Sequence, residues 1–362
     1  MSAHIVTKEQ IKYLFDTWYQ SMLKQQVEKA RQLKEEIDNN INHVELDEDV
    51  LLYFALLNFR YNVLTDWISI KEDSFNNVES FEIPNKGYLA YYYHFFKAIY
   101  LMFVTKYKEA KEQFETAENL LKYVPNKLEQ AEFYYRLGYF YNQSYQHMSA
   151  IDCIKKAKEE FIKQPDCEIN VALCENMFGL CCIDLRQFEL AEETFNAALD
   201  VFRKANHKKY VLMVRNNLGL LYANQNLSEL AIRHLSEVTN HSQNHFRAIY
   251  LESDENLKIG EYEKAEGLIE KGLYICDQLE NQEYQHRFMI LKAMNTNTAA
   301  LETAVLAGIS YFEKEELFDC IEEYADRLAD KFYNDNNYEK AVEYYRMGKE
   351  ARKKQMEKGA LR

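Results

Sequence analysis

Few residues in this chain have the type and spacing that enzyme chemistry needs. His241 and His245 are four residues apart and could share one helical face, but the intervening residues lack the glutamate of the zinc motif H-E-x-x-H. A solvated polar turn is the simpler interpretation. The adjacent Cys181 and Cys182 are too close for an easy disulfide and suit a helix core. Glycine-rich phosphate loops and the G-x-S-x-G nucleophile elbow are both absent from the sequence. We therefore expect no metal ion and no cofactor.

Three polar side chains within apolar helical runs are better candidates for a binding site. Asp184 ends the run Cys-Cys-Ile-Asp, and Asn217 and Asn224 lie seven residues apart on about the same helical face. A carboxylate in apolar surroundings is costly unless it has a cationic or hydrogen-bonding partner. Two interpretations stay open. These residues are either a surface acid with ordinary repeat-turn asparagines, or a clamp for an extended peptide that carries a basic side chain.

Composition excludes several classes of protein. The 10 glycines and 3 prolines among 362 residues are too few for a β-sandwich or a low-complexity chain. The net charge of -14 disfavours direct binding to nucleic acid or to an anionic membrane, and it favours a cationic partner. Seven cysteines without a C-x-x-C pair indicate free thiols in a reducing cytoplasm. The sequence contains neither a membrane-spanning apolar run nor an N-terminal signal pattern.

A repeat of about 40 residues organises most of the chain. The pattern is an aromatic residue followed by a small residue at +3, a large one at +7 and a small one at +10, and the copy at Ser228 is a weaker match. Copies begin at Tyr107, His147, Phe188, Ser228, Tyr262 and Tyr338. The last interval is 76 residues, twice 38, which predicts a degenerate copy near residue 300. Gly138, Gly179 and Gly219 precede three copies and would allow close helix packing. This is the helix–turn–helix pattern of tetratricopeptide repeats.

The sequence thus predicts an all-α protein with three parts. Residues 1–69 contain three off-period helices, the first opened by a capping box at Thr7–Gln10, and should form a three-helix bundle. Residues 70–86, which include Pro84, should be a linker. Residues 87–362 should form a superhelix of about seven repeats, whose concave groove is typical of peptide binding.

The chain resembles the Rap proteins, the response-regulator aspartate phosphatases of spore-forming Gram-positive bacteria. The resemblance spans almost the whole chain, with bundle, linker and array in the family's order. It is carried by Trp18-Tyr19, the run EDVLLYF at 48–54, Phe59-Arg60, the run YYHFFK at 92–97 and the run EQAEF at 129–133.

The resemblance implies a cytoplasmic quorum-sensing regulator. Members engage a response regulator through the bundle and the early repeats, and they act in sporulation or competence. A short, typically basic Phr peptide, secreted and re-imported, binds the repeat groove and releases the target. Peptide contacts are thereby implied for Asp184 and Asn217. Target contacts are implied for Asp47, Glu48, Phe59 and Glu129.

Whether this chain is an enzyme turns on Glu48. Phosphatase members place a glutamine there that orients water, whereas a carboxylate only accepts hydrogen bonds and adds negative charge. Asn126 and Cys167 replace an aspartate and a tyrosine of some phosphatases. Three hypotheses follow. The chain is a sequestering regulator under peptide control, an active aspartyl-phosphate phosphatase of the sporulation phosphorelay, or a general tetratricopeptide adaptor.

Overall fold

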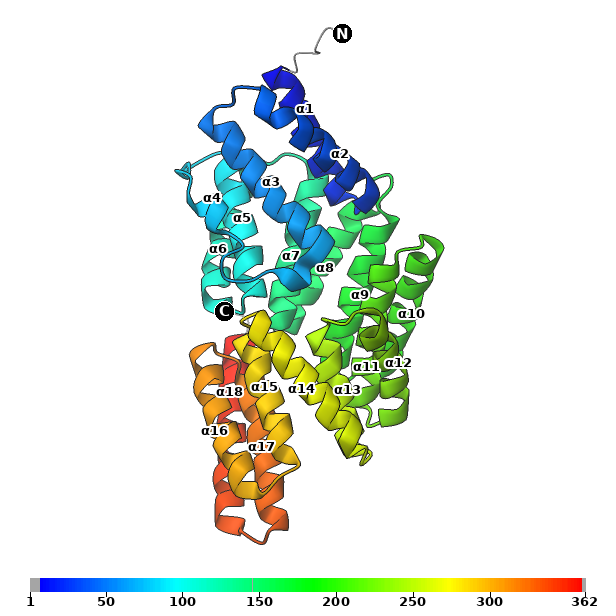
Figure 1. Ribbon diagram of the computed structural model, residues 1–362, viewed down its shortest axis with the longest axis vertical. Coiled ribbons are helices and arrows are strands. Elements are labelled where there is room, and N and C mark those ends of the chain that lie inside the picture. The colour runs from blue at the N-terminus through cyan, green and yellow to red at the C-terminus, as the bar shows by residue number, and fades with distance from the viewer. Residues whose placement is uncertain (1–6, 145, 360–362) are drawn as a thin grey trace. The chain divides into compact units, whose positions relative to one another are not determined.

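The computed structural model describes residues 7–144 and 146–359, and side chains up to residue 357. The described residues form α-helices joined by short turns, and no strand occurs among them. Figure 1 follows the helices in chain order from α1 to α18. Within these ranges, no helix is both long enough and apolar enough to span a bilayer.

Three helices occupy the N-terminal region, as predicted: α1 (Lys8–Leu23), α2 (Val27–Asn40) and α3 (Glu48–Asp66). The capping box is present, because Thr7 and Gln10 exchange side chain-to-backbone hydrogen bonds at the start of α1. The segment 70–86 contains the one-turn helix α4 (Asn76–Glu79). The segment is held to the helices around it, since Phe75 is fully buried and Tyr100 donates a hydrogen bond to the Glu72 carbonyl at 2.6 Å.

Among the described residues after position 86, fourteen helices follow as seven consecutive pairs, which confirms the predicted repeat number. The first helices of the pairs are α5 (Tyr88–Phe103), α7 (Lys127–Gln143), α9 (Glu168–Asp184), α11 (Lys208–Asn224), α13 (Phe246–Lys258), α15 (Gln282–Met294) and α17 (Phe318–Asn334). The second helices are α6 (Tyr107–Leu120), α8 (His147–Phe161), α10 (Phe188–Lys204), α12 (Ser228–His241), α14 (Tyr262–Gln278), α16 (Thr298–Lys314) and α18 (Tyr338–Gly359). Short 3-10 turns follow α2, α3 and α6, at Ile41–His43, Trp67–Ser69 and Leu121–Tyr123. The copy predicted near residue 300 is α16, in which Leu301, Val305 and Gly308 fill the +3, +7 and +10 positions.

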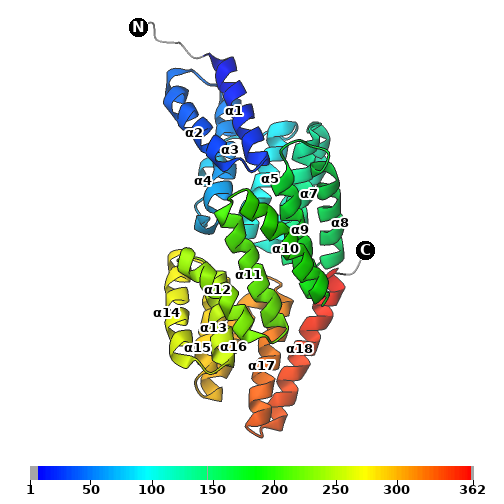
Figure 2. The same ribbon diagram turned by 90° about the vertical axis from the view of Figure 1, so that its right-hand side faces the viewer.

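The chain forms two compact units. Unit 1 comprises residues 1–137 and 153–174, and unit 2 comprises residues 138–152 and 175–362. Unit 1 therefore holds α1 to α6, and unit 2 holds α10 to α18. Within unit 2, α17 and α18 lie side by side (Figure 2).

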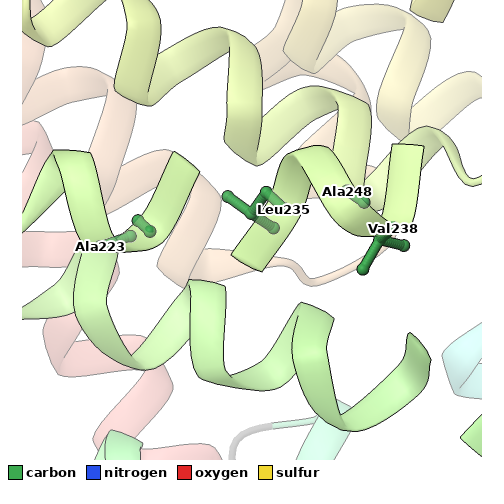
Figure 3. Close-up of a cluster of buried hydrophobic side chains, with 5 residues drawn as sticks. Ala223, Leu235, Val238 and Ala248 are labelled. Atoms are coloured by element: carbon green, nitrogen blue, oxygen red, sulfur yellow. The ribbon is translucent and has the colours of Figure 1, made fainter. Parts of the chain in front are cut away.

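Small residues let the paired helices approach closely, as the repeat pattern predicted. A Cβ atom added to Gly219 would lie 2.5 Å from Leu235 Cγ, and one added to Gly179 would lie 2.6 Å from Phe195. Leu235 belongs to a fully apolar cluster completed by Ala223, Ala231, Val238 and Ala248 (Figure 3). Glycine and alanine are thus required at these positions because the paired helices pack too closely for larger side chains, and no binding or catalytic role is needed to explain them.

The α1–α2 hairpin has the same construction as a repeat, which the sequence analysis missed. Its three-residue turn places Gln25 at φ 57°, and the α11–α12 turn places Asn226 at the same φ. Ala30 and Ile37 occupy the +3 and +10 positions of α2 and are fully buried. Lys34 stands at +7, where the array has a large apolar or aromatic residue. The polar +7 residue hid the repeat pattern.

Candidate functional site

Asp184, the last residue of α9, is a partly exposed carboxylate in unit 2. Asn142 Nδ2 donates a hydrogen bond to Asp184 Oδ2 at 3.3 Å, and His147 Nδ1 lies 3.3 Å from the same oxygen. One third of the Asp184 side chain (33%) is exposed to solvent. The carboxylate is therefore held by two neighbours and remains reachable from outside.

The electrostatics around Asp184 favour a positively charged guest. Burial raises its pKa to about 7, and the negative charge of Asp319 on α17 raises it as well, while the Asn142 hydrogen bond acts in the opposite direction. Burial also lowers the pKa of His147, so the histidine does not act as a firm cationic partner. In the described part of the chain, no lysine or arginine forms an ion pair with Asp184. A cation placed here would relieve the cost of the buried charge.

Asn217 lies on α11 in the interior of unit 2 and is 6% exposed. Its Nδ2 donates to Asn176 Oδ1 on α9 at 2.8 Å, and its Oδ1 accepts from Asn216 Nδ2 at 3.3 Å. The amide is already satisfied by other amides. The amide nitrogen has two hydrogens, so it can donate to a further acceptor while it keeps its hydrogen bond to Asn176.

Asn224 differs from the other two predicted peptide contacts. It lies on the exposed surface at the end of α11, and its Nδ2 donates to the Leu220 carbonyl of its own helix at 2.9 Å. The structure joins Asp184, Asn217 and Asn224 by no direct hydrogen bond. Each of the first two is instead linked to an asparagine on another helix.

Sequence reasoning missed these linking asparagines, although the repeat contained a signal. Asn142 precedes Asp184 by 42 residues and Asn176 precedes Asn217 by 41, which is one repeat period in each case. A search for polar residues one period away would have found both. The approach of Asp319 to Asp184 follows only from the superhelix.

The cysteine and histidine candidates show no sign of a catalytic or metal site. All seven cysteines are buried and free, as predicted. His241 ends α12, whereas His245 precedes α13 and its Nδ1 accepts from the Ala248 amide at 3.2 Å. The two histidines therefore do not share a helical face. Within residues 7–144 and 146–359, no group of three histidine, cysteine, aspartate or glutamate side chains is arranged to hold a metal ion.

Two of the predicted target contacts lie at the exposed start of α3 in unit 1. Asp47 caps the helix by accepting from the Val50 amide at 3.0 Å, and it forms an ion pair with Lys8. These two contacts, with the Lys8 bond the larger cause, lower the pKa of Asp47. Glu48 is the first helical residue and is exposed. A partner protein can reach both side chains directly.

The other two predicted target contacts are buried in unit 1. Phe59 packs with its ring 4.9 Å from the ring of Phe75. Glu129 is 7% exposed and accepts a hydrogen bond from Tyr92 Oη at 2.6 Å. Burial raises the pKa of Glu129 to about 7.

Besides Glu48, two further positions that depart from the phosphatase pattern have local roles in unit 1. Asn126 Oδ1 accepts from the Leu128 amide at 2.9 Å, at the start of α7. Cys167 is buried before the start of α9, and burial raises the pKa of its thiol. In this conformation neither side chain is presented as a catalytic group.

Comparison with known proteins finds similarity along the whole chain. A protein-family model described as "response regulator aspartate phosphatase H, N terminal" matches residues 5–66. The response regulator aspartate phosphatase I of Bacillus subtilis (strain 168) is 26% identical over 370 aligned positions, which cover 99% of this chain and 93% of that protein.

Solved structures share the fold. A Rap protein complexed with competence and sporulation factor has a TM-score of 0.82 at 22% identity, covering 96% of this chain and 99% of that one. The Rap conjugation gene regulator of plasmid pLS20, in complex with the Phr* peptide, has a TM-score of 0.70 at 20% identity, with 96% of each chain covered. At this level of identity, the likeness establishes the helical-repeat architecture.

Proposed function

We propose that this chain is a peptide-regulated protein of the Rap family that binds a bacterial response regulator and inhibits it. Support comes from the match of residues 5–66 to a response-regulator phosphatase N-terminus and from similarity over 99% of the chain to a relative named for that activity. The pLS20 Rap regulator, which has the same fold, was solved with a bound Phr* peptide. We place the protein in the cytoplasm, where its free thiols would stay reduced.

The Asp184 carboxylate carries the peptide-binding part of the proposal. Its pKa is raised by burial and by the negative charge of Asp319. One third of its side chain is exposed, and among the described residues it has no lysine or arginine partner. A basic side chain of the peptide would supply that missing cation. The net charge of -14 further favours a cationic peptide over nucleic acid as a ligand.

Asn217 is proposed to hold the peptide backbone. Its bond to Asn176 leaves an amide pair in the interior of unit 2, at 2.8 Å. A peptide group offers one donor and one acceptor, which are the groups that an asparagine side chain matches. Because the Asn217 amide nitrogen carries two hydrogens, it could donate one to a peptide carbonyl and keep the other in its hydrogen bond to Asn176.

Sequestration is the inhibitory mode that the residues favour. Glu48 lies exposed at the N-terminus of α3, where the helix dipole stabilises a carboxylate. A carboxylate cannot donate a hydrogen bond to an attacking water, and it would repel a phosphoryl group. The alternative is an active aspartyl-phosphate phosphatase, and the family name of the relatives keeps that alternative open.

The decisive experiment measures phosphate release from a phosphorylated single-domain sporulation response regulator. Wild type and Glu48→Gln are compared at substoichiometric protein, and binding is measured in parallel by calorimetry with the phosphorylated and unphosphorylated regulator. Sequestration predicts no turnover by wild type and binding that does not depend on phosphorylation. Multiple turnovers by wild type would establish the phosphatase instead.

Peptide control is tested with synthetic pentapeptides that carry one arginine at each position in turn, each paired with its uncharged citrulline counterpart. An arginine peptide that binds should release the regulator, and its citrulline form should not. Regulator binding that survives saturation with the bound peptide would overturn this part of the proposal.

A further inference from the structure

We infer that unit 1 contains a second cation-binding site, formed by tyrosine rings and two aspartates, that receives a lysine or arginine side chain of a partner protein. The site is a cavity of about 200 Å³ between α1, α3 and α5. Its lining residues are Lys12, Asp16, Asp49, Val50, Tyr53, Tyr88 and Tyr92. None of them belongs to the Asp184 site.

Three tyrosines form the aromatic part of this cavity, here called the tyrosine cage (Tyr53, Tyr88 and Tyr92). The rings of Tyr53 and Tyr92 are stacked, with centroids 5.7 Å apart. Tyr88 stands across both rings, at 84° and 6.2 Å from Tyr53 and at 74° and 6.1 Å from Tyr92. Clusters of aromatic rings that line a cavity are typical of cation recognition, because ring faces carry negative potential.

Two exposed carboxylates complete the site. Asp16 and Asp49 both line the cavity, and Asp16 Oδ1 accepts a hydrogen bond from Tyr53 Oη at 3.2 Å. Both carboxylates act electrostatically on the tyrosine cage. The pKa of Tyr88 is raised mainly by burial, and also by the negative charges of Asp49 and Asp16. The cavity therefore combines tyrosine rings with two carboxylates, and both attract a cation.

The size of the cavity selects the head of a side chain. A volume of about 200 Å³ exceeds the roughly 30 Å³ of a single water molecule. It is below the roughly 300–1,000 Å³ of pockets that bind metabolites or drugs. Half of the Tyr88 surface (52%) is exposed, so the cavity can be entered from solvent. A guanidinium or ammonium group on a flexible stem matches this space.

Lys12 is the one lysine or arginine among the lining residues. Burial raises the pKa of Asp16, and the Tyr53 hydrogen bond and the charge of Lys12 act in the opposite direction, so the Lys12 ammonium lies near enough to compete with a guest. Its side chain is exposed on α1 and can move away. Removing it should therefore strengthen the binding of an external cation, an effect that a purely structural lysine would not have.

The test titrates N-acetyl-arginine amide into the full chain and follows the probe by saturation-transfer NMR. N-acetyl-citrulline amide, which has nearly the same shape without the charge, is the matched control. All proteins in this test carry Asp184→Asn, which disables the proposed peptide site. The result therefore does not depend on whether the peptide-site proposal is correct. Tetramethylammonium is titrated separately to distinguish a small free cation from a side-chain head.

Variants then assign the binding to the cage. Tyr88→Leu should weaken arginine-amide binding by about 2- to 5-fold, and Tyr88→Phe should leave it within about 2-fold because the ring face remains. Tyr262→Leu is the matched control, since Tyr262 on α14 has an equal exposed fraction (53% against 52%) outside the cage. Asp16→Asn combined with Asp49→Asn should weaken binding by at least about 5-fold, and Lys12→Gln should strengthen it.

The proposal predicts binding of the arginine amide, no binding of the citrulline amide and the order of variants given above. Equal binding of arginine and citrulline amides would overturn it. So would a Tyr88→Leu effect no larger than that of Tyr262→Leu. Tetramethylammonium binding without arginine-amide binding would overturn the assignment to a side-chain head.

Discussion

Two carboxyl groups, one in each compact unit, have pKa values raised to about 7 by burial, yet their surroundings differ. Glu129 in unit 1 is 7% exposed and lies behind the hydroxyl of Tyr92. Asp184 in unit 2 is one-third exposed and has amide and imidazole neighbours. A third carboxylate, Glu132, is fully enclosed in unit 1 but contacts Arg60 and Arg136, and these arginines lower its pKa despite burial.

The comparison shows that burial alone does not identify a binding carboxylate. Glu132 has its cations within the protein, and Glu129 is closed to solvent. Only Asp184, of the three, combines a carboxylate whose pKa is raised by partial burial with access for an external cation. The predictions below test this distinction, beginning with the largest expected effect.

Arg60→Ala should destabilise the protein by about 3–5 kcal/mol, because it leaves the buried Glu132 carboxylate with one arginine fewer. The free energy of unfolding is measured by urea denaturation at pH 7. Arg31→Ala is the matched control. Arg31 forms exposed pairs with Glu28 and Glu35, and its loss should cost at most about 1 kcal/mol. Equal effects of the two substitutions would mean that Glu132 does not depend on its internal cation.

Asp184→Ala and Asn217→Ala should each weaken the binding of an arginine-containing pentapeptide by about 1–3 kcal/mol, the cost of leaving a charged or polar group without its partner. Isothermal titration calorimetry measures the affinities. Asp200→Ala, which removes an exposed carboxylate on α10, should leave affinity unchanged. Unchanged affinity in both site variants would eliminate the proposed peptide site.

Peptide affinity should rise about tenfold between pH 6 and pH 8, because a basic side chain binds the ionised form of a carboxyl group whose free pKa is about 7. Binding should release protons, which calorimetry in buffers of different ionisation enthalpy detects. In Asp184→Asn the pH dependence should disappear. A profile that is the same in wild type and in this variant would assign the titration to another group.

Glu129→Gln should stabilise the protein at pH 8 by up to about 3 kcal/mol and have little effect near pH 4.5. The native pKa of Glu129, about 7, lies above its ordinary value of 4.5, so the native state holds a proton that the unfolded state loses. Stability is therefore lost as pH rises between these values, and the neutral amide avoids that loss. Thermal unfolding at both pH values measures the difference, and equal shifts at the two would contradict it.

Much of the fold was readable in the sequence because local patterns repeat. The +3, +7 and +10 residues predicted the second helix of each repeat pair, from α6 to α18. Helix α16 was predicted only because the copies at Tyr262 and Tyr338 lie 76 residues apart, which is twice 38. The capping box at Thr7 marked the start of α1. The α1–α2 hairpin escaped recognition as a repeat because Lys34 breaks the apolar pattern at one position.

The site was readable only in part. The unusual setting of Asp184 and Asn217 within apolar helices was visible in the sequence, since helical periodicity and residue type are local properties. Their asparagine partners, the approach of Asp319 and the enclosure of Glu129 by Tyr92 were not. These facts depend on which faces of different helices meet. Tertiary packing alone decides that, and with it which buried carboxylate keeps an opening to solvent.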